Sequence, residues 1–259
     1  MHTPLRIRFV ISVLLLLIGG ILITYAGQQP INIIPVPESI TYEKGMHKLP
    51  KGTLYISAEK GSESEFNLLK QQMFDLFGIK VETTTSNRKA SVILTLDPLK
   101  AIVPEAYELH ITPAVINIIG HDNAGVFYGI QTLLQLFHNN QQTNSRQLPC
   151  LVIKDAPRFV WRAFMLDEAR FFKGEEVVKQ LLDEMAALKM NVFHWHLTDD
   201  QGWRVESKKY PLRTKIGSQR KDTQCGGWKS PTTYGEPHEG YYTQEQIKDI
   251  LRYAKERHI

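Results

Sequence analysis

Residues 163–197 constrain the fold more than any other part of the chain. They begin with an apolar run, Ala163–Asp167, and end with a second at 192–197, and both runs have the length of a strand. Between them, residues 175–189 carry apolar side chains at the spacing of one helix face, namely Val178, Leu181, Leu182, Met185 and Leu188. Strands and helices alternate in this order in α/β domains with a parallel sheet, so the segment predicts such a domain.

Two adjacent carboxylates follow the second strand. Residues 193–204 read FHWHLTDDQGWR, so Asp199 and Asp200 come directly after an aromatic, apolar run. In barrels built from strand–helix units, active sites lie at the carboxyl ends of the strands. We therefore take a sugar-processing enzyme as the first hypothesis. Alternation along the strand leaves open which of the two carboxylates faces inward.

The first strand ends in a second candidate pair, Asp167 and Arg170. A guanidinium keeps its charge and offers several N–H donors in a fixed plane, which suits it to grip vicinal hydroxyls. The alternative interpretation is a surface salt bridge. Asp199, after the second strand, could either accept sugar hydroxyls or hold Arg170 through a bidentate ion pair.

Histidines on the second strand do not predict a metal centre. His194 and His196 are two residues apart and share one strand face, but no third ligand stands out nearby. The spacing of Cys150 and Cys225 does not fit a zinc site either. We predict neither metal nor cofactor, and whether the two cysteines pair in an oxidising compartment stays open.

Residues 30–155 predict a separate α+β domain. Short β-branched runs at 53–57, 80–84, 90–96, 107–112 and 115–119 read as strands. Two helical patterns lie among them, one ending at Gly78 and one starting near Gly125, which would place helices on one face of a sheet. The Asp155-Ala156-Pro157 stretch reads as the junction to a second domain at 158–259.

The second domain holds only about two strand–helix units before Ile259. A closed barrel needs eight, so we expect the first part of an α/β (β/α)8 TIM barrel belonging to a longer enzyme. Residues 201–242 show no periodicity and predict a long loop rich in aromatic residues, among them Trp203. A final helix is expected at 244–257, with Thr243 and Gln246 forming a capping box.

The first residues predict a secretory signal. Arg6 and Arg8 precede an apolar run at 9–23 and small residues near Ala26, so cleavage after about residue 26 and export to the periplasm or exterior are expected. A signal anchor is the alternative, and we expect no stable membrane insertion after cleavage. Without residues 1–26 the chain has 29 basic and 27 acidic residues, a net charge of +2, which gives no electrostatic case for nucleic acid.

At these motifs the sequence resembles family 20 glycoside hydrolases, the β-N-acetylhexosaminidases. Residues 35–37, 105–109 and 125–133 are similar to that family's non-catalytic N-terminal domain, and residues 165–204 to the opening of its catalytic barrel. The family often has Gly where this chain has Ala163, and His where it has Phe171. Neither departure touches the proposed contacts.

The resemblance implies an exo-acting enzyme that releases terminal N-acetylhexosamine (GlcNAc or GalNAc) from oligosaccharides, chitooligosaccharides or glycoconjugates. It implies that Arg170 binds the sugar's O3 and O4 hydroxyls and that Asp199 supports that site. Asp167, Asp200 and Trp203 are further candidates for supporting contacts. It also implies retaining, substrate-assisted hydrolysis, in which the substrate's own acetamido oxygen attacks the anomeric carbon.

The family's catalytic Asp-Glu pair lies on a later barrel strand, after a Gly-Gly. We therefore expect no catalytic residue in this chain and no hydrolysis by the chain alone. Two alternatives remain open. One is a non-catalytic or degenerate sugar-binding fragment, and the other is a different retaining barrel glycosidase that uses two protein carboxylates.

Overall fold

The computed structural model describes residues 31–50, 52–100, 103–142, 146–227 and 229–259. The expected signal at residues 1–26 lies outside these ranges. Ile33–Ile259 form one compact unit, and every element below belongs to it. No helix in the described ranges is long and apolar enough to cross a membrane.

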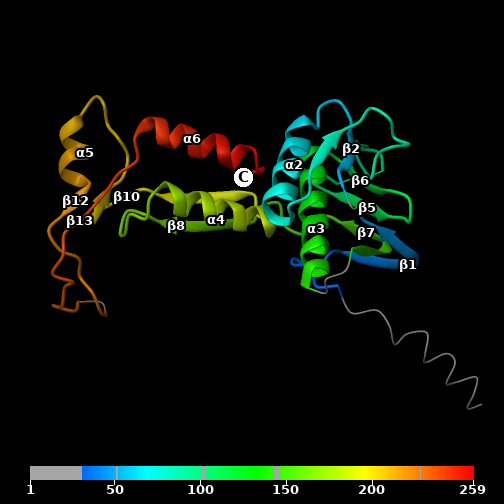
Figure 1. Ribbon diagram of the computed structural model, residues 1–259. Helices are drawn as coiled ribbons and strands as arrows, with labels where there is room; N and C mark the ends of the chain where they lie inside the picture. The colour runs from blue at the N-terminus through cyan, green and yellow to red at the C-terminus, as the bar shows by residue number, and fades with distance from the viewer. Residues whose placement is uncertain (1–30, 51, 101–102, 143–145, 228) are drawn as a thin grey trace, which may run out of the picture. The chain divides into compact units, whose positions relative to one another are not determined.

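A seven-stranded mixed sheet forms the first half (Figure 1). Its spatial order is β1-β7-β5-β6-β4-β2-β3. The pairs among β2, β3, β4 and β6 are parallel, and those joining β1, β7, β5 and β6 are antiparallel. The strands are β1 (Ser39–Lys48), β2 (Leu54–Ala58), β3 (Val81–Thr83), β4 (Val92–Leu96), β5 (Tyr107–Ile111), β6 (Ile116–Gly120) and β7 (Gln147–Asp155).

Helices α2 (Glu63–Phe77) and α3 (Asn123–Gln142) cover one face of this sheet (Figure 1). Leu69 and Met73 of α2 and Phe127 and Ile130 of α3 are buried in the resulting core. Gly78 ends α2 in the left-handed conformation at φ 64°, as a helix-stopping glycine should. The α+β domain predicted from the sequence is confirmed.

The edge strand β1 was not predicted from the sequence. Nearly all its side chains are exposed or partly exposed, and only His47 is buried. Its register against β7 also shifts between Tyr42 and Met46, where Gly45 has a φ of 111°. A strand with one neighbour and an interrupted register carries no alternating apolar pattern, so its sequence gives no signal.

The second half begins with the predicted strand–helix–strand unit. Strands β8 (Ala163–Asp167) and β9 (Val192–His196) are parallel, and α4 (Glu175–Ala187) connects them. Helix α6 (Gln244–Lys255) packs against α4 around Val178, Leu182, Met185, Tyr242, Ile250 and Ala254. The predicted capping box is present: Gln246 N–H donates to Thr243 Oγ1, and Thr243 N–H donates to Gln246 Oε1.

Residues 201–242 differ from the unstructured loop expected. They contain helix α5 (Pro211–Gly217) and the antiparallel pair of β12 (Gln219–Arg220) with β13 (His238–Glu239), and their first strand, β11 (Gly202–Trp203), pairs antiparallel with β10 (Thr198–Asp199) just before them. Two-residue strands and a seven-residue helix are too short to show a hydrophobic period. Cys150 and Cys225 are free thiols, so they do not pair.

Candidate functional site

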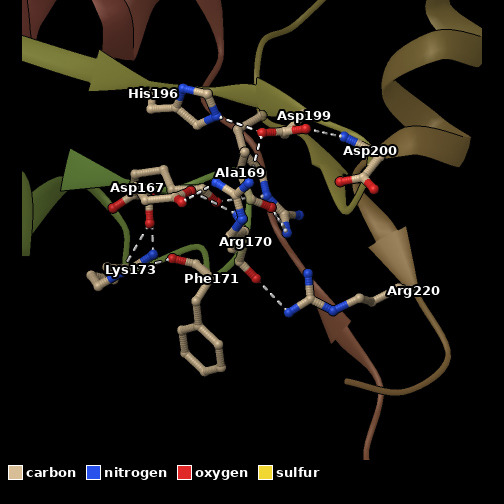
Figure 2. A network of polar contacts seen from close by, with 11 residues as sticks. Asp167, Ala169, Arg170, Phe171, Lys173, His196, Asp199, Asp200 and Arg220 are labelled. Carbon is tan, nitrogen blue, oxygen red and sulfur yellow. Dashed lines mark hydrogen bonds and ion pairs between the residues drawn. The ribbon is translucent and has the colours of Figure 1, made fainter. Parts of the chain in front are cut away.

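The register of β8 and β9 brings the two predicted carboxylate sites together. Asp167, the last residue of β8, lies opposite His196, the last residue of β9. Arg170 lies in the turn that follows β8, and Asp199 lies on the short strand β10 that follows β9, so both residues are at the carboxyl ends of the two parallel strands (Figure 2). This is the edge at which strand–helix barrels place their functional groups.

Arg170 lies between the two carboxylates. Its Nη1 donates to Asp167 Oδ2 at 2.5 Å, and its Nη2 is 3.0 Å from Asp199 Oδ2 (Figure 2). The Arg170 backbone N–H also donates to Asp167 Oδ1 at 3.0 Å. A bidentate pair with Asp199, one of the two roles considered for that carboxylate, is therefore absent among the described residues, because the guanidinium divides its donors between two partners.

Asp199 is held by three donors. Besides Arg170, it accepts from His196 Nε2 at 3.0 Å and from the Asp200 backbone N–H at 2.8 Å. The Asp200 and His196 hydrogen bonds lower the pKa of Asp199, and the Arg170 charge adds to this. For Asp167, partial burial opposes ionisation, but the hydrogen bonds and charge of Arg170 prevail and its pKa is also lowered. Both carboxylates are thus ionised at neutral pH.

The network is accessible to a solute. The Arg170 side chain is 54% exposed and that of Asp199 is 32% exposed. Within the described part of the chain, the two ion pairs use two of the five guanidinium N–H groups. The remaining N–H donors of Arg170 lie beside the carboxylate acceptors of Asp167 and Asp199. Such a pair of groups can hydrogen-bond a vicinal diol, because each hydroxyl of a diol both donates and accepts.

The remaining predicted residues have lesser roles in this network. Asp200 contributes its backbone N–H. The hydrogen bond and charge of Asp167 raise the pKa of Arg170, and the charges of Asp199 and Asp200 act in the same direction. Trp203 packs against α5 instead: its Nε1 donates to Val205 O at 2.6 Å, and the Arg213 guanidinium lies 4.7 Å from its ring centroid. Trp203 is thus placed as a packing residue of the long loop.

The sequence analysis missed two arginines that contact the backbone beside Arg170. Arg204 and Arg220 both donate to carbonyls of the turn that carries Arg170. Both come from residues 201–242, where no periodicity indicated that these side chains turn toward β8. Within the described ranges no group of three or more His, Cys, Asp or Glu side chains is arranged to hold a metal.

A guanidinium between two carboxylates, at the carboxyl ends of parallel strands, lies where α/β barrels carry their functional groups, so the fold places this half of the chain in the α/β class. Comparison with protein families then gives the family. The family described as "Glycosyl hydrolase family 20, catalytic domain" matches residues 159–259, and "Glycosyl hydrolase family 20, domain 2" matches residues 30–156. The chain belongs to glycosyl hydrolase family 20.

Named relatives agree with this assignment. The chain is 37% identical over 238 residues to a beta-hexosaminidase of Porphyromonas gingivalis, a match that covers 88% of this chain and 29% of that protein. It resembles the crystal structure of beta-N-acetylhexosaminidase from Bacteroides fragilis with a TM-score of 0.74 and 32% identity, covering 89% of this chain and 44% of that one.

A solved complex also matches. A mutant Streptomyces plicatus beta-hexosaminidase in complex with product (GlcNAc) aligns with a TM-score of 0.75 and 29% identity, covering 89% of this chain and 45% of that one. The chain therefore spans less than half the length of these three relatives. It contains domain 2 and only part of the catalytic domain.

Proposed function

We propose that this chain forms part of the substrate site of a β-N-acetylhexosaminidase. It forms the part that binds the outer hydroxyls, O3 and O4, of a terminal N-acetylhexosamine. The observation that carries the proposal is Arg170, half-exposed and fixed between Asp167 and Asp199. Its free donors face a ligand's O3 and O4, and Asp199 accepts a hydroxyl proton. The GlcNAc bound by the Streptomyces plicatus relative supports this choice of sugar.

The carboxylates of this site position the substrate and do not protonate it. A general acid must hold its proton near neutral pH, which requires a raised pKa. The pKa values of Asp167 and Asp199 are instead lowered by their hydrogen bonds and by Arg170. In the reaction we propose, the substrate's acetamido oxygen attacks the anomeric carbon with retention, and a carboxylic acid from outside residues 1–259 protonates the leaving oxygen.

The binding step is testable with the chain itself. We would titrate N-acetylglucosamine into 15N-labelled protein and follow the arginine Nε–Hε signals by NMR. The Arg170 signal should shift, and the signal of Arg88, an exposed arginine of the sheet domain, should not. N-acetylglucosamine analogues lacking the O3 or O4 hydroxyl should bind more weakly. If the chemical shift of the Arg170 signal stays unchanged at a saturating concentration of the sugar, the proposed binding site is wrong.

The catalytic step is tested by sequencing the gene beyond the codon for Ile259 and by assaying the protein that it encodes. The DNA after the codon for Ile259 should continue in frame into a barrel that contains Gly-Gly-Asp-Glu, and that protein should hydrolyse an aryl N-acetylglucosaminide. If it does not, the sugar-binding role without hydrolysis is the function that remains. Dependence of hydrolysis on the substrate's N-acetyl group would separate this mechanism from one that uses two protein carboxylates.

Export is a further part of this proposal. It is supported by the basic residues Arg6 and Arg8 followed by the apolar run at 9–23. Fractionation of expressing cells should find the protein outside the cytoplasm, with a new N-terminus near residue 27 by terminal sequencing. Cytoplasmic protein with an intact N-terminus would reject it.

A further inference from the structure

We propose that Arg204 and Arg220, both from the long segment 201–242, are positioning residues for Arg170. The proposal rests on the sugar-binding role of Arg170 for its functional meaning. Its structural basis is separate: between them, the two guanidinium groups hold the carbonyls of three consecutive residues, Glu168, Ala169 and Arg170.

Arg204 holds the first two of these carbonyls from inside the core. Its side chain is among the largest that are fully buried, with 1% exposure. Its Nε donates to Glu168 O at 3.0 Å and its Nη2 to Ala169 O at 3.1 Å. Its Nη1 turns the other way and donates to Ser218 O at 2.8 Å and Gly240 O at 3.0 Å. One guanidinium thus joins the turn after β8 to both halves of the long segment.

Arg220 holds the third carbonyl from the rim. Its Nη2 donates to Arg170 O at 2.6 Å (Figure 2), its Nη1 to Gln201 O at 3.3 Å and its Nε to Thr223 Oγ1 at 2.8 Å. Arg220 sits on β12, which pairs with β13. The residue that carries the sugar-binding guanidinium is therefore tied through its own backbone to a strand pair some fifty residues away in sequence.

The amide side of the same turn is also fixed. The N–H groups of Glu168 and Ala169 both donate to His196 O at 3.0 Å. The approach is close enough to demand glycine at 202, since a Cβ there would lie 2.5 Å from Ala169 O and 2.6 Å from Arg204 Cζ. With its amides bound to β9 and its carbonyls bound to two arginines, the turn has little freedom to rotate its peptide planes.

This arrangement requires arginine rather than any cation. Each guanidinium spans at least three acceptors that lie in different directions, and the planar fork reaches them together. A lysine ammonium is a single point on a flexible stem and cannot span the same set. Arg170 has to keep its donors within hydrogen-bond reach of two carboxylates and a ligand at once, so a displacement of the turn of about 1 Å would cost substantial binding.

The test compares Arg220→Met and Arg220→Lys with Lys221→Met in the full chain without sugar. Lys221 is the exposed neighbour of Arg220, and Lys221→Met is the control because it removes the same charge as Arg220→Met. Backbone hydrogen exchange should become about 10- to 100-fold faster at Arg170 in both Arg220 variants, as expected for the loss of one hydrogen bond to a charged group. The carboxyl pKa values of Asp167 and Asp199, followed by 13C NMR, should rise toward their ordinary range.

Lysine at 220 should fail to rescue either property, which separates positioning from a mere need for positive charge. The proposal would be overturned if Arg170 exchanged its amide hydrogen in Arg220→Met at the wild-type rate. It would also be overturned if Arg220→Lys had the exchange rate and carboxyl pKa values of wild type. If Arg220→Met unfolds, Thr223→Val removes only the Nε anchor of Arg220, keeps its charge and is expected to change both properties in the same direction. Unchanged exchange in that variant would equally count against the proposal.

The outcome does not depend on the proposed function, because both measurements are made without sugar. Titration of N-acetylglucosamine into the same variants adds the functional consequence: weaker binding in both Arg220 variants and unchanged binding in Lys221→Met. If wild type binds no sugar while the exchange result holds, the proposed function fails and the positioning role stands.

Discussion

The Tyr242 hydroxyl donates to Glu168 Oε2 at 2.9 Å, in the core between β8, α4 and α6. Both side chains are fully buried, and the same oxygen accepts the Lys173 backbone N–H at 3.0 Å. Burial and the nearby carboxylate raise the pKa of Tyr242 far above its ordinary range, so this hydroxyl keeps its proton and can donate at neutral pH.

Tyr242→Phe should therefore destabilise the chain by about 1–3 kcal/mol, since it leaves a buried carboxylate short of a donor. Urea unfolding measures the change, and the neighbouring Tyr241→Phe is the matched control because that side chain is 42% exposed. Equal stabilities of the two variants would show that the Glu168 carboxylate does not need this partner.

Substitution of Arg170 should weaken sugar binding without harming the fold. Arg170→Ala removes the donors that we assign to O3 and O4, and the loss of a charged hydrogen bond predicts about 10- to 100-fold weaker binding. Titration of N-acetylglucosamine measures this, with Arg88→Ala as the control for charge. Arg170→Lys should recover only part of the affinity, because an ammonium cannot contact both carboxylates as the fork does. Unchanged affinity in Arg170→Ala would remove this residue from the site.

Stability should fall on mild acidification because of His238. Its Nε2 accepts the Phe172 backbone N–H at 2.9 Å, which requires the neutral ring. Burial lowers the pKa of His238, and the charges of Arg220, Arg204 and Lys173 act in the same direction. A folded-state pKa below the unfolded value of about 6.5 means that this stability is complete above pH 6.5 and is lost as the pH falls through the folded pKa.

The free energy of unfolding should thus decrease between pH 7.5 and 5. His238→Gln, whose side-chain oxygen can accept the same N–H, should flatten this part of the curve. His194→Gln replaces an exposed histidine and should leave the pH dependence as it is in wild type. If the free energy of unfolding of His238→Gln depends on pH in the same way as that of wild type, groups other than His238 cause the acid sensitivity.

A buried lysine joins the end of α4 to the sheet. Lys189 Nζ donates to Asp155 Oδ2 at 2.7 Å and to Tyr107 Oη at 2.8 Å, and its side chain is 8% exposed. Asp155→Leu leaves that ammonium without its counter-charge, and we expect a loss of about 3–5 kcal/mol. Urea unfolding should show no comparable loss for Glu82→Gln, which breaks an exposed pair with Lys80. A small effect of Asp155→Leu would mean that Lys189 loses its proton or reaches water.

Interior elements were predictable because their patterns are long and regular. The boundaries of β8 match the prediction, and α4 starts at Glu175 as expected. Its end differs: the helix stops at Ala187, and Lys189 adopts a φ of 57°. The apolar period continued through Leu188, and nothing in it revealed that Lys189 turns inward to meet Asp155 and Tyr107 from the first half of the chain.

The sequence alone determined the order of strands and helices, the family, and the candidates Asp167, Arg170 and Asp199. The local sequence pattern is enough to predict these features, because the hydrophobic period of a strand and the position of its last residue can be read from residues that are adjacent in sequence. Only the tertiary structure decided that Arg170 lies between the two carboxylates and that Arg204 and Arg220 hold its turn. The contacts of Arg204 and Arg220 join side chains to backbone carbonyls up to fifty residues away, and a carbonyl is present at every residue, so no residue type marks the acceptor in advance.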